Sequence, residues 1–186
     1  DLVISYGGPK AKDEQLKNRA ELNQLVGQAY FEKGDYKRAL PYLEFAATNL
    51  RSSLRSVDYY QLGYAQHQNG FYKQAITNFE AQTKLDKDNA MGQNGLYHLA
   101  DCHLRNNNKH AARTYFGQAA ALNFDPSIKD DALINYAKLS YELKLDREAL
   151  VALQSIPANS RNYEDAQALM GELFLNTRDY DRAVAT

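Results

Sequence analysis

A small residue followed twelve positions later by alanine recurs at a nearly constant interval along this chain. The five pairs are Gly27–Ala39, Gly63–Ala75, Ala100–Ala112, Ala137–Ala149 and Gly171–Ala183. Their first members are 36, 37, 37 and 34 residues apart, so the pattern runs through most of the 186 residues. Self-similarity at a fixed period of roughly 20–50 residues is typical of proteins that stack copies of one supersecondary unit. The chain is therefore predicted to be a repeat array.

Other columns of the same frame indicate that the unit is helical. A large, mostly apolar residue precedes each small residue, and another apolar residue follows the alanine by four positions in the first four units. These columns contain Val26, Leu62, Leu99, Tyr136 and Met170, then Leu43, Phe79, Phe116 and Leu153. Apolar spacings of three and four residues place side chains on one face of a helix.

A turn is predicted between the two members of each pair. The segments at 33–36, 69–72, 106–109, 144–147 and 177–180 each contain Gly, Asn or Asp. These residues tolerate left-handed backbone geometry and cap the following helix. Each unit is therefore predicted to be a helix, a tight turn and a second helix.

These spacings and residue types resemble the tetratricopeptide repeat, whose period is near 34. The best-matching segments read VGQAYFEKGDYKRALPYL at 26–43 and YYQLGYAQHQNGFYKQAITNF at 59–79. The third and fourth units keep the spacing but use alanine for glycine, and His103 and Ser140 stand where the motif has tyrosine. The resemblance covers residues 18–186. It implies an all-α fold, a right-handed α-solenoid of antiparallel helix-turn-helix repeats.

The array is expected to contain about four complete repeats and a truncated fifth. We place them near residues 20–53, 56–89, 93–126, 130–163 and 164–186. Residues 1–17 are expected to be an N-terminal segment, either a linker or the tail of a preceding repeat. The final repeat stops inside its second helix, whereas arrays normally end in a polar capping helix. We therefore expect the sequence to be a segment of a larger protein, and its tryptophan-free composition, rich in tyrosine and asparagine, favours a bacterial source.

Gly63 lies inside a predicted helix, where glycine costs about 1 kcal/mol relative to alanine. Small residues are found where the two helices of such a hairpin cross closely. We predict that Gly63 lets Ala75 approach, so that packing outweighs helix propensity. A leucine at position 63 would then destabilise the hairpin by at least about 1–3 kcal/mol, as overpacking does.

Candidate catalytic and metal-binding residues are few. His98, Asp101 and Cys102 could share a helix face, with His103 and His110 nearby, and such spacing suits metal ligands. We favour the alternative, in which Cys102 and His103 are core residues, because the sequence offers no second ligand pair. It also contains no nucleophile motif and no glycine-rich phosphate loop. The chain is predicted not to be an enzyme and to use no metal or cofactor.

Composition argues against two other classes of partner. With 22 basic and 23 acidic residues the formal net charge is −1, so the chain has no general attraction for nucleic acid or anionic lipid. No apolar run approaches the roughly 18 residues that a membrane-spanning helix needs. Neither nucleic-acid binding nor membrane insertion is expected. The single cysteine excludes an internal disulfide, and bacterial cytoplasm and periplasm are both compatible locations.

In tetratricopeptide arrays the first helix of each unit lines a concave groove, where partners usually bind. The resemblance places inward side chains one residue after, and three residues before, each small residue. The candidate peptide-binding residues are Gln24, Gln28, Tyr60, Tyr64, His67, Tyr97 and Asp101, and later repeats place Ile134, Lys138, Ala168 and Glu172 there. Tyrosine suits peptide binding because it offers apolar area and a hydrogen-bonding tip at low entropy cost. The alternative is that these tyrosines only pack between adjacent repeats.

One family binding mode is not expected. Arrays that clasp a C-terminal carboxylate use lysine, asparagine and arginine at positions where this sequence has Gln24, Gln28, Asn94 and His98. The expected function is a non-enzymatic interaction scaffold that binds a protein or an extended peptide. The alternative is an architectural or oligomerisation segment of a larger assembly, with no ligand in the groove.

Overall fold

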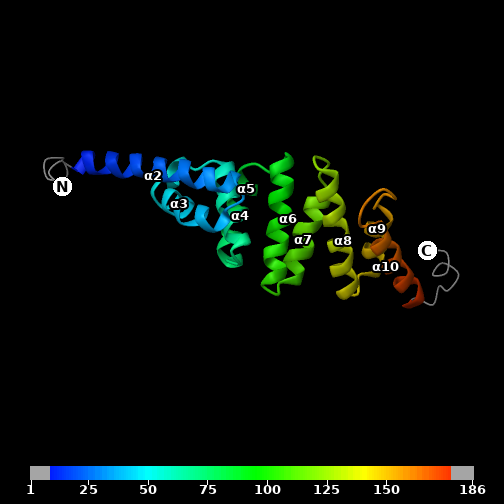
Figure 1. Ribbon diagram of the computed structural model, residues 1–186. Coiled ribbons are helices and arrows are strands. Elements are labelled where there is room, and N and C mark those ends of the chain that lie inside the picture. Colours follow the sequence, from blue (N-terminus) through cyan, green and yellow to red (C-terminus); the bar gives the residue numbers. More distant parts are fainter. Residues whose placement is uncertain (1–8, 177–186) are drawn as a thin grey trace. The chain divides into compact units, whose positions relative to one another are not determined.

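The computed structural model describes residues 9–176, and α-helices account for most of them (Figure 1). These residues form nine α-helices and one short 3₁₀-helix, with no β-strand among them. The prediction of an all-α array of helix-turn-helix repeats is confirmed. The chain divides into two compact units, Asp1–Leu85 and Asp86–Thr186, which we call unit 1 and unit 2.

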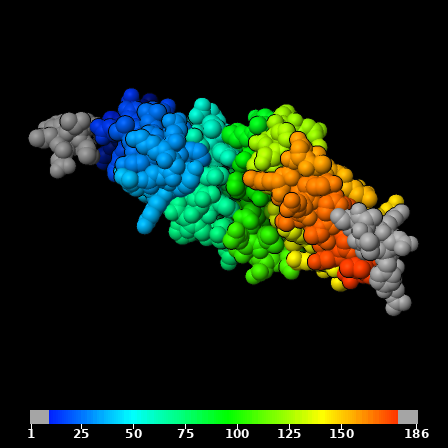
Figure 2. Space-filling view, turned by 45° about the vertical axis from the view of Figure 1, so that its right-hand side comes forward, coloured from blue at the N-terminus to red at the C-terminus, as the bar shows by residue number. Residues whose placement is uncertain are grey.

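Unit 1 contains two helical hairpins. Its elements are α2 (Pro9–Glu32), α3 (Tyr36–Asn49), the 3₁₀-helix η1 (Arg51–Ser53), α4 (Ser56–Gln68) and α5 (Tyr72–Leu85). The first hairpin packs α2 against α3, drawn in blue in the space-filling view (Figure 2). Because α2 begins at Pro9, the chain is already helical before residue 18. The predicted boundary of the N-terminal segment and the repeat limits stay predictions.

Unit 2 continues the pattern. Its elements are α6 (Ala90–Arg105), α7 (Lys109–Ala120), α8 (Pro126–Glu142), α9 (Asp146–Gln154) and α10 (Tyr163–Asn176). Pro126 begins α8, at a position where its missing N–H removes no helical hydrogen bond. The second helix of the fifth repeat, with Ala183, lies outside the described residues.

The turns inside the four complete hairpins share one geometry. Each has a single residue with positive φ, at 34, 70, 107 and 144. The next residue donates its N–H to the carbonyl five positions earlier, as in Asp35 to Tyr30 at 2.9 Å and Leu145 to Ser140 at 2.8 Å. This bond satisfies a carbonyl that the helix end would otherwise leave unpaired. The predicted tight turns are thus helix-terminating motifs of one kind.

The turn residues agree with the sequence prediction at three of the four sites. Gly34, Gly70 and Asn107 take the left-handed conformation, with φ between 58° and 80°. In the fourth turn Lys144 does so instead, at φ 63°. A side chain with a Cβ is strained there. Asp35 and Asn108 cap the following helices, accepting hydrogen bonds from the backbone N–H groups of residues 38 and 111.

The small residues of the repeat lie where helices cross, as predicted, but their neighbour differs from the expected one. Gly63 is buried, and a Cβ built there would lie 3.3 Å from the ring of Phe79, one turn after Ala75. Gly27 is tighter, because its Cβ would lie 2.8 Å from Cδ2 of Leu43. The glycines therefore make room for the large residue four positions after the alanine. Both large residues are buried as a result.

Candidate functional site

The predicted inward tyrosines of unit 1 lie in a continuous group of aromatic rings. Tyr64 is central, with the ring centroid of Tyr36 at 5.1 Å and that of Phe31 at 5.7 Å. Tyr60, one helical turn earlier on α4, lies 5.8 Å from Tyr64. His67, one turn later, lies 6.4 Å from the same ring. These five residues and Tyr72, whose ring lies 5.5 Å from His67, are called the aromatic cluster below.

The aromatic cluster joins two repeats and also forms a surface. Phe31 and Tyr36 come from the first hairpin, whereas Tyr60, Tyr64 and His67 come from α4 in the second. The rings therefore pack between adjacent repeats, which was the alternative interpretation of the tyrosines. Every member of the cluster is nevertheless partly exposed. Contact between the hairpins holds the rings in place while their edges still face solvent.

Gln24 and Gln28, the predicted inward residues of α2, both reach the same carboxylate on α4. The Nε2 atom of Gln24 donates to Oδ1 of Asp58 at 2.8 Å, and Nε2 of Gln28 lies 3.5 Å from the same oxygen. Arg55 donates to Asp58 through its backbone N–H at 2.9 Å and its Nε at 3.1 Å. Only 5% of the Asp58 side chain is exposed. The two glutamines are thus tied to the next repeat.

Asp58 was not singled out from the sequence, although a signal for it exists. It lies five residues before the small anchor Gly63. The residues at the same place in the other repeats are Leu22, Gly95, Ala132 and Ala166. A charged residue stands out in a column that is otherwise small or apolar, so this comparison would have identified it.

The remaining predicted residues, Tyr97 and Asp101, belong to unit 2. The Tyr97 ring packs against Phe116, with 5.4 Å between centroids. Burial raises the pKa of Tyr97, and the negative charges of Asp131 and Asp101 raise it further. Asp101 forms an ion pair with Arg105 at 3.5 Å. The Tyr97 ring therefore lies near charged side chains.

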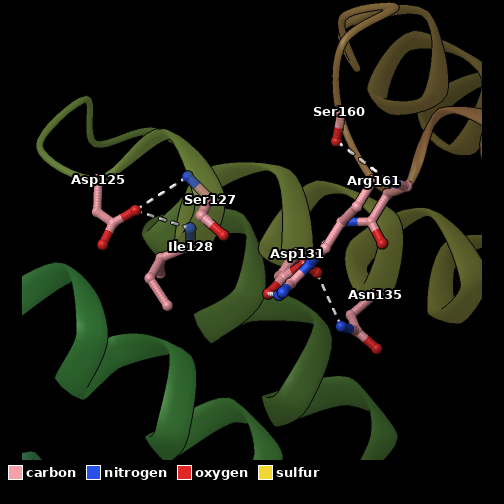
Figure 3. A network of polar contacts seen from close by, with 8 residues as sticks. Asp125, Ser127, Ile128, Asp131, Asn135, Ser160 and Arg161 are labelled. Atoms are coloured by element: carbon pink, nitrogen blue, oxygen red, sulfur yellow. Dashed lines mark hydrogen bonds and ion pairs between the residues drawn. The ribbon is translucent and has the colours of Figure 1, made fainter.

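A polar network connects α8 to the loop that precedes α10 (Figure 3). Asp131, only 13% exposed, accepts hydrogen bonds from Arg161 and from Nδ2 of Asn162, the latter at 2.7 Å. Its backbone carbonyl accepts from Asn135 at 2.8 Å, as Figure 3 shows. Nearby, the carboxylate of Asp125 caps α8 by accepting from the N–H of Ser127 at 2.9 Å. The arrangement is structural, because it connects α8 to the loop that follows α9.

The suggested metal ligands are distributed through packed structure. Cys102 is completely buried, and burial raises the pKa of its thiol to about 12. His103 stacks on Tyr115 with 5.4 Å between rings. Within residues 9–176 no three His, Cys, Asp or Glu side chains are grouped as metal ligands. In the same range, no helix combines the length and apolar character of a membrane span.

Unit 2 also has a groove that was not predicted from the sequence. It has a volume of about 830 Å³ and lies between α7 and α9, with α8 as its floor. Gly117, Ala121 and Val151 line its sides, and Tyr136 lies at its base. A Cβ at Gly117 would lie 3.1 Å from the Tyr136 ring, so the absent side chain leaves the floor uncovered. Most of its lining residues come from α7 and α9, the second helices of their hairpins.

The chain was compared with known proteins. The family model described as tetratricopeptide repeat matches residues 20–47, 59–89 and 94–126. No curated protein sequence matches the chain. Among solved structures, MamA is 19% identical, with 86% of this chain and 89% of that one covered and a TM-score of 0.71. YrrB, titled "a TPR protein with an unusual peptide-binding site", is 18% identical over 88% and 80%, with a TM-score of 0.70. MamA from Desulfovibrio magneticus RS-1 is 19% identical over 90% of each chain, with a TM-score of 0.68. At these identities the likeness concerns the fold.

Proposed function

We propose that this chain, which belongs to the tetratricopeptide repeat family, is a protein-interaction module that binds an extended stretch of polypeptide. The binding surface would be the inner face of unit 1, defined by Gln24, Gln28, Tyr60, Tyr64 and His67. In unit 2, Tyr97 and Asp101 would contact polypeptide on a separate surface of that unit. The single observation that carries the proposal is the aromatic cluster, whose rings are held by one another and remain partly exposed.

Preorganised tyrosines favour binding for a physical reason. A side chain that is already fixed by its neighbours loses little entropy when a ligand contacts it. Tyrosine adds apolar area with a hydroxyl at its tip. YrrB has the same fold and is described as having an unusual peptide-binding site, which supports a peptide as the ligand class.

The test is selection from a random peptide library displayed on phage, followed by titration of the selected peptides by isothermal calorimetry. We expect wild-type protein to enrich a peptide family and the Tyr60→Ala, Tyr64→Ala double variant to lose at least about tenfold in affinity, as hot-spot tyrosines do. Tyr59→Ala is the matched control, because Tyr59 is on the same helix and lines a groove on its other side. Equal affinity for all three proteins would contradict the proposal, provided that their melting curves show folded protein.

A second candidate function, an architectural segment, is favoured by the free side of α2. Leu22 and Leu25 are 61% and 64% exposed. At the position of Leu22, the later repeats have Asp58, Ala132 and Ala166, all buried. A further helix packed on α2 would cover these leucines, either from the same assembly or from a second copy. Concentration-dependent association in sedimentation velocity, abolished by Leu22→Glu with Leu25→Glu, would favour this function over peptide binding.

A further inference from the structure

Asp58 is a buried carboxylate in a column of the repeat that is otherwise small or apolar. The corresponding positions in neighbouring repeats hold Leu22, Gly95, Ala132 and Ala166. Burying a carboxylate is expensive unless it is fully hydrogen-bonded. Asp58 meets that condition, because Oδ2 accepts two hydrogen bonds from Arg55 and Oδ1 accepts from Arg55, Gln24 and Gln28. The bond from the Arg55 backbone N–H caps the first turn of α4, whereas the bonds from Gln24 and Gln28 reach across to α2 and orient those two amides.

The carboxylate determines how the two glutamine amides are oriented. An ionised carboxylate can only accept hydrogen bonds, so each glutamine must present its NH₂ group to Asp58. The Nε2 atoms of Gln24 and Gln28 do so, at 2.8 Å and 3.5 Å from Oδ1. Each amide carbonyl oxygen, Oε1, is consequently turned away from Asp58. The inner face of α2 therefore carries two oriented acceptors in place of amides that could rotate either way.

The opposing helix supplies the complementary groups. Tyr60 and Tyr64 of α4 carry phenol hydroxyls that donate as well as accept. Burial raises the pKa of both, and for Tyr64 the neighbouring Tyr36 raises it further. Their hydroxyls hence keep their protons at any physiological pH. A peptide main chain offers N–H donors and carbonyl acceptors in alternation along its length, so it could use both kinds of group.

We propose that Asp58 is a positioning residue that sets the hydrogen-bonding direction of this face. The ligand class is an extended peptide whose main-chain N–H groups donate to Oε1 of Gln24 and Gln28, with uncharged or basic side chains at that point. An acidic side chain placed against the two Oε1 atoms would be disfavoured, because a carbonyl oxygen cannot donate a hydrogen bond to a carboxylate. This inference rests on the proposed function, since it specifies what the inner face of unit 1 recognises.

The experiment uses a peptide selected by wild-type protein from the random phage library. Single N-methylation of each peptide bond removes one main-chain N–H donor at a time. At one or two positions we expect about three- to tenfold weaker binding, the fold-change for one lost hydrogen bond. Asp58→Asn should weaken the unmethylated peptide by a similar factor and abolish the penalty of methylation, because an asparagine no longer dictates the amide orientation.

Two further variants keep the test decisive if Asp58→Asn fails to fold. Gln24→Met and Gln28→Met preserve side-chain length but lack the acceptor, and each should weaken binding about three- to tenfold for the same reason. Gln15→Met, an exposed change on α2, is the control and should have no effect. If a selected peptide depends on Tyr60 and Tyr64 but is insensitive to N-methylation and to both methionine variants, this inference is wrong and the proposed function stands. If no peptide binds at all, the proposed function itself fails.

Discussion

At the scale of single residues, the most informative side chain is a buried glutamine. Gln93 is completely buried in α6 and makes four hydrogen bonds. Its Nε2 donates to the carbonyls of Ala119 and Leu122 at 3.0 and 2.8 Å, and its Oε1 accepts from the N–H groups of Phe124 and Asp125 at 3.1 and 2.7 Å. Three of these partners lie between α7 and α8, and Ala119 lies in the last turn of α7. The Gln93 side chain thus hydrogen-bonds backbone groups along the connection from α7 to α8. These bonds explain why a polar residue is tolerated at a buried position.

We predict that Gln93→Leu destabilises the protein by at least about 2 kcal/mol, because four backbone groups each lose a hydrogen bond. The measurement is the midpoint of urea unfolding followed by circular dichroism. Gln154→Leu, at the exposed end of α9, is the control and should change stability by less than about 0.5 kcal/mol. Coincident unfolding curves for the two variants would show that the joint does not depend on Gln93.

Cys102 allows a second prediction at this scale. Its buried thiol has a pKa raised from 9.0 to about 12, so thiolate is scarce in the folded protein and we expect negligible reaction with DTNB until denaturant is added. The raised pKa of the thiol also makes the stability of the fold depend on pH. The folded state holds this proton more tightly, so the thiol's contribution to stability is complete below about pH 9 and is lost as the pH rises toward about 12. Rapid labelling of the native protein would contradict the burial.

At the scale of elements, the same turns and helix crossings recur along the array, but the residues that form them differ between repeats. The four described turns share a backbone conformation, yet the left-handed position is glycine in two, asparagine in one and lysine in the last. The crossings also differ, because Gly27 lies closer to its neighbour than Gly63 does. Equivalent positions in a repeat array therefore carry unequal strain, and the differences can be measured.

The fourth turn, in which Lys144 has positive φ, offers a site where a substitution should raise stability. Lys144→Gly is expected to stabilise the protein by about 1 kcal/mol, since glycine adopts positive φ without the Cβ clash. Asn107→Gly serves as the comparison and should gain less, because asparagine already tolerates that conformation. Thermal melting checks the prediction. A melting temperature that falls in Lys144→Gly would mean that the contact of its ammonium group with the Tyr141 ring outweighs the backbone strain.

The glycines at the crossings should differ in their tolerance of a methyl group. In Gly27→Ala the new Cβ would lie 2.8 Å from Cδ2 of Leu43 and 3.1 Å from its backbone nitrogen, so we expect a loss of about 1–3 kcal/mol. In Gly63→Ala the nearest atoms are in a ring at 3.3 Å, and a helix-propensity gain of about 1 kcal/mol offsets the contact. Gly63→Leu should destabilise clearly. The order of the three unfolding midpoints decides this, and a Gly27→Ala protein as stable as wild type would refute it.

At the scale of the whole molecule, the chain consists of two compact units, each stabilised by contacts between sequential helices. In repeat arrays each unit contacts mainly its neighbours, so stability is close to a sum of local terms. Local damage should therefore produce local opening instead of uniform destabilisation.

Hydrogen exchange followed by mass spectrometry tests this locality. Gln93→Leu should accelerate exchange within residues 86–176 more than within 9–85, and Gly27→Ala should do the reverse, because each change lies in one unit. The two variants act as controls for each other. Equal acceleration of both segments in both proteins would indicate a single cooperative domain.

The candidate site could be predicted only in part from the sequence. Tyr60 and Tyr64 were predicted from the resemblance to tetratricopeptide arrays, and His67 because it lies one turn beyond Tyr64. The three side chains do meet in the aromatic cluster. Phe31 and Tyr36 were missed because they belong to the other hairpin, and their approach depends on how the hairpins pack. Asp58 was missed for a similar reason, since its partners Gln24 and Gln28 lie more than 29 residues earlier in the chain.

The order of helices and turns was determined by the sequence alone, because periodicity, small residues and turn-forming residues act within a few positions of one another. The tertiary structure decided which large side chain faces each glycine, which carboxylate orients the glutamines of α2, and that Lys144 must take a left-handed conformation. These features depend on groups brought together across hairpins or on a backbone shape imposed by packing. Local spacing limits the angle at which a side chain leaves its helix, whereas only the packed chain specifies what that side chain meets.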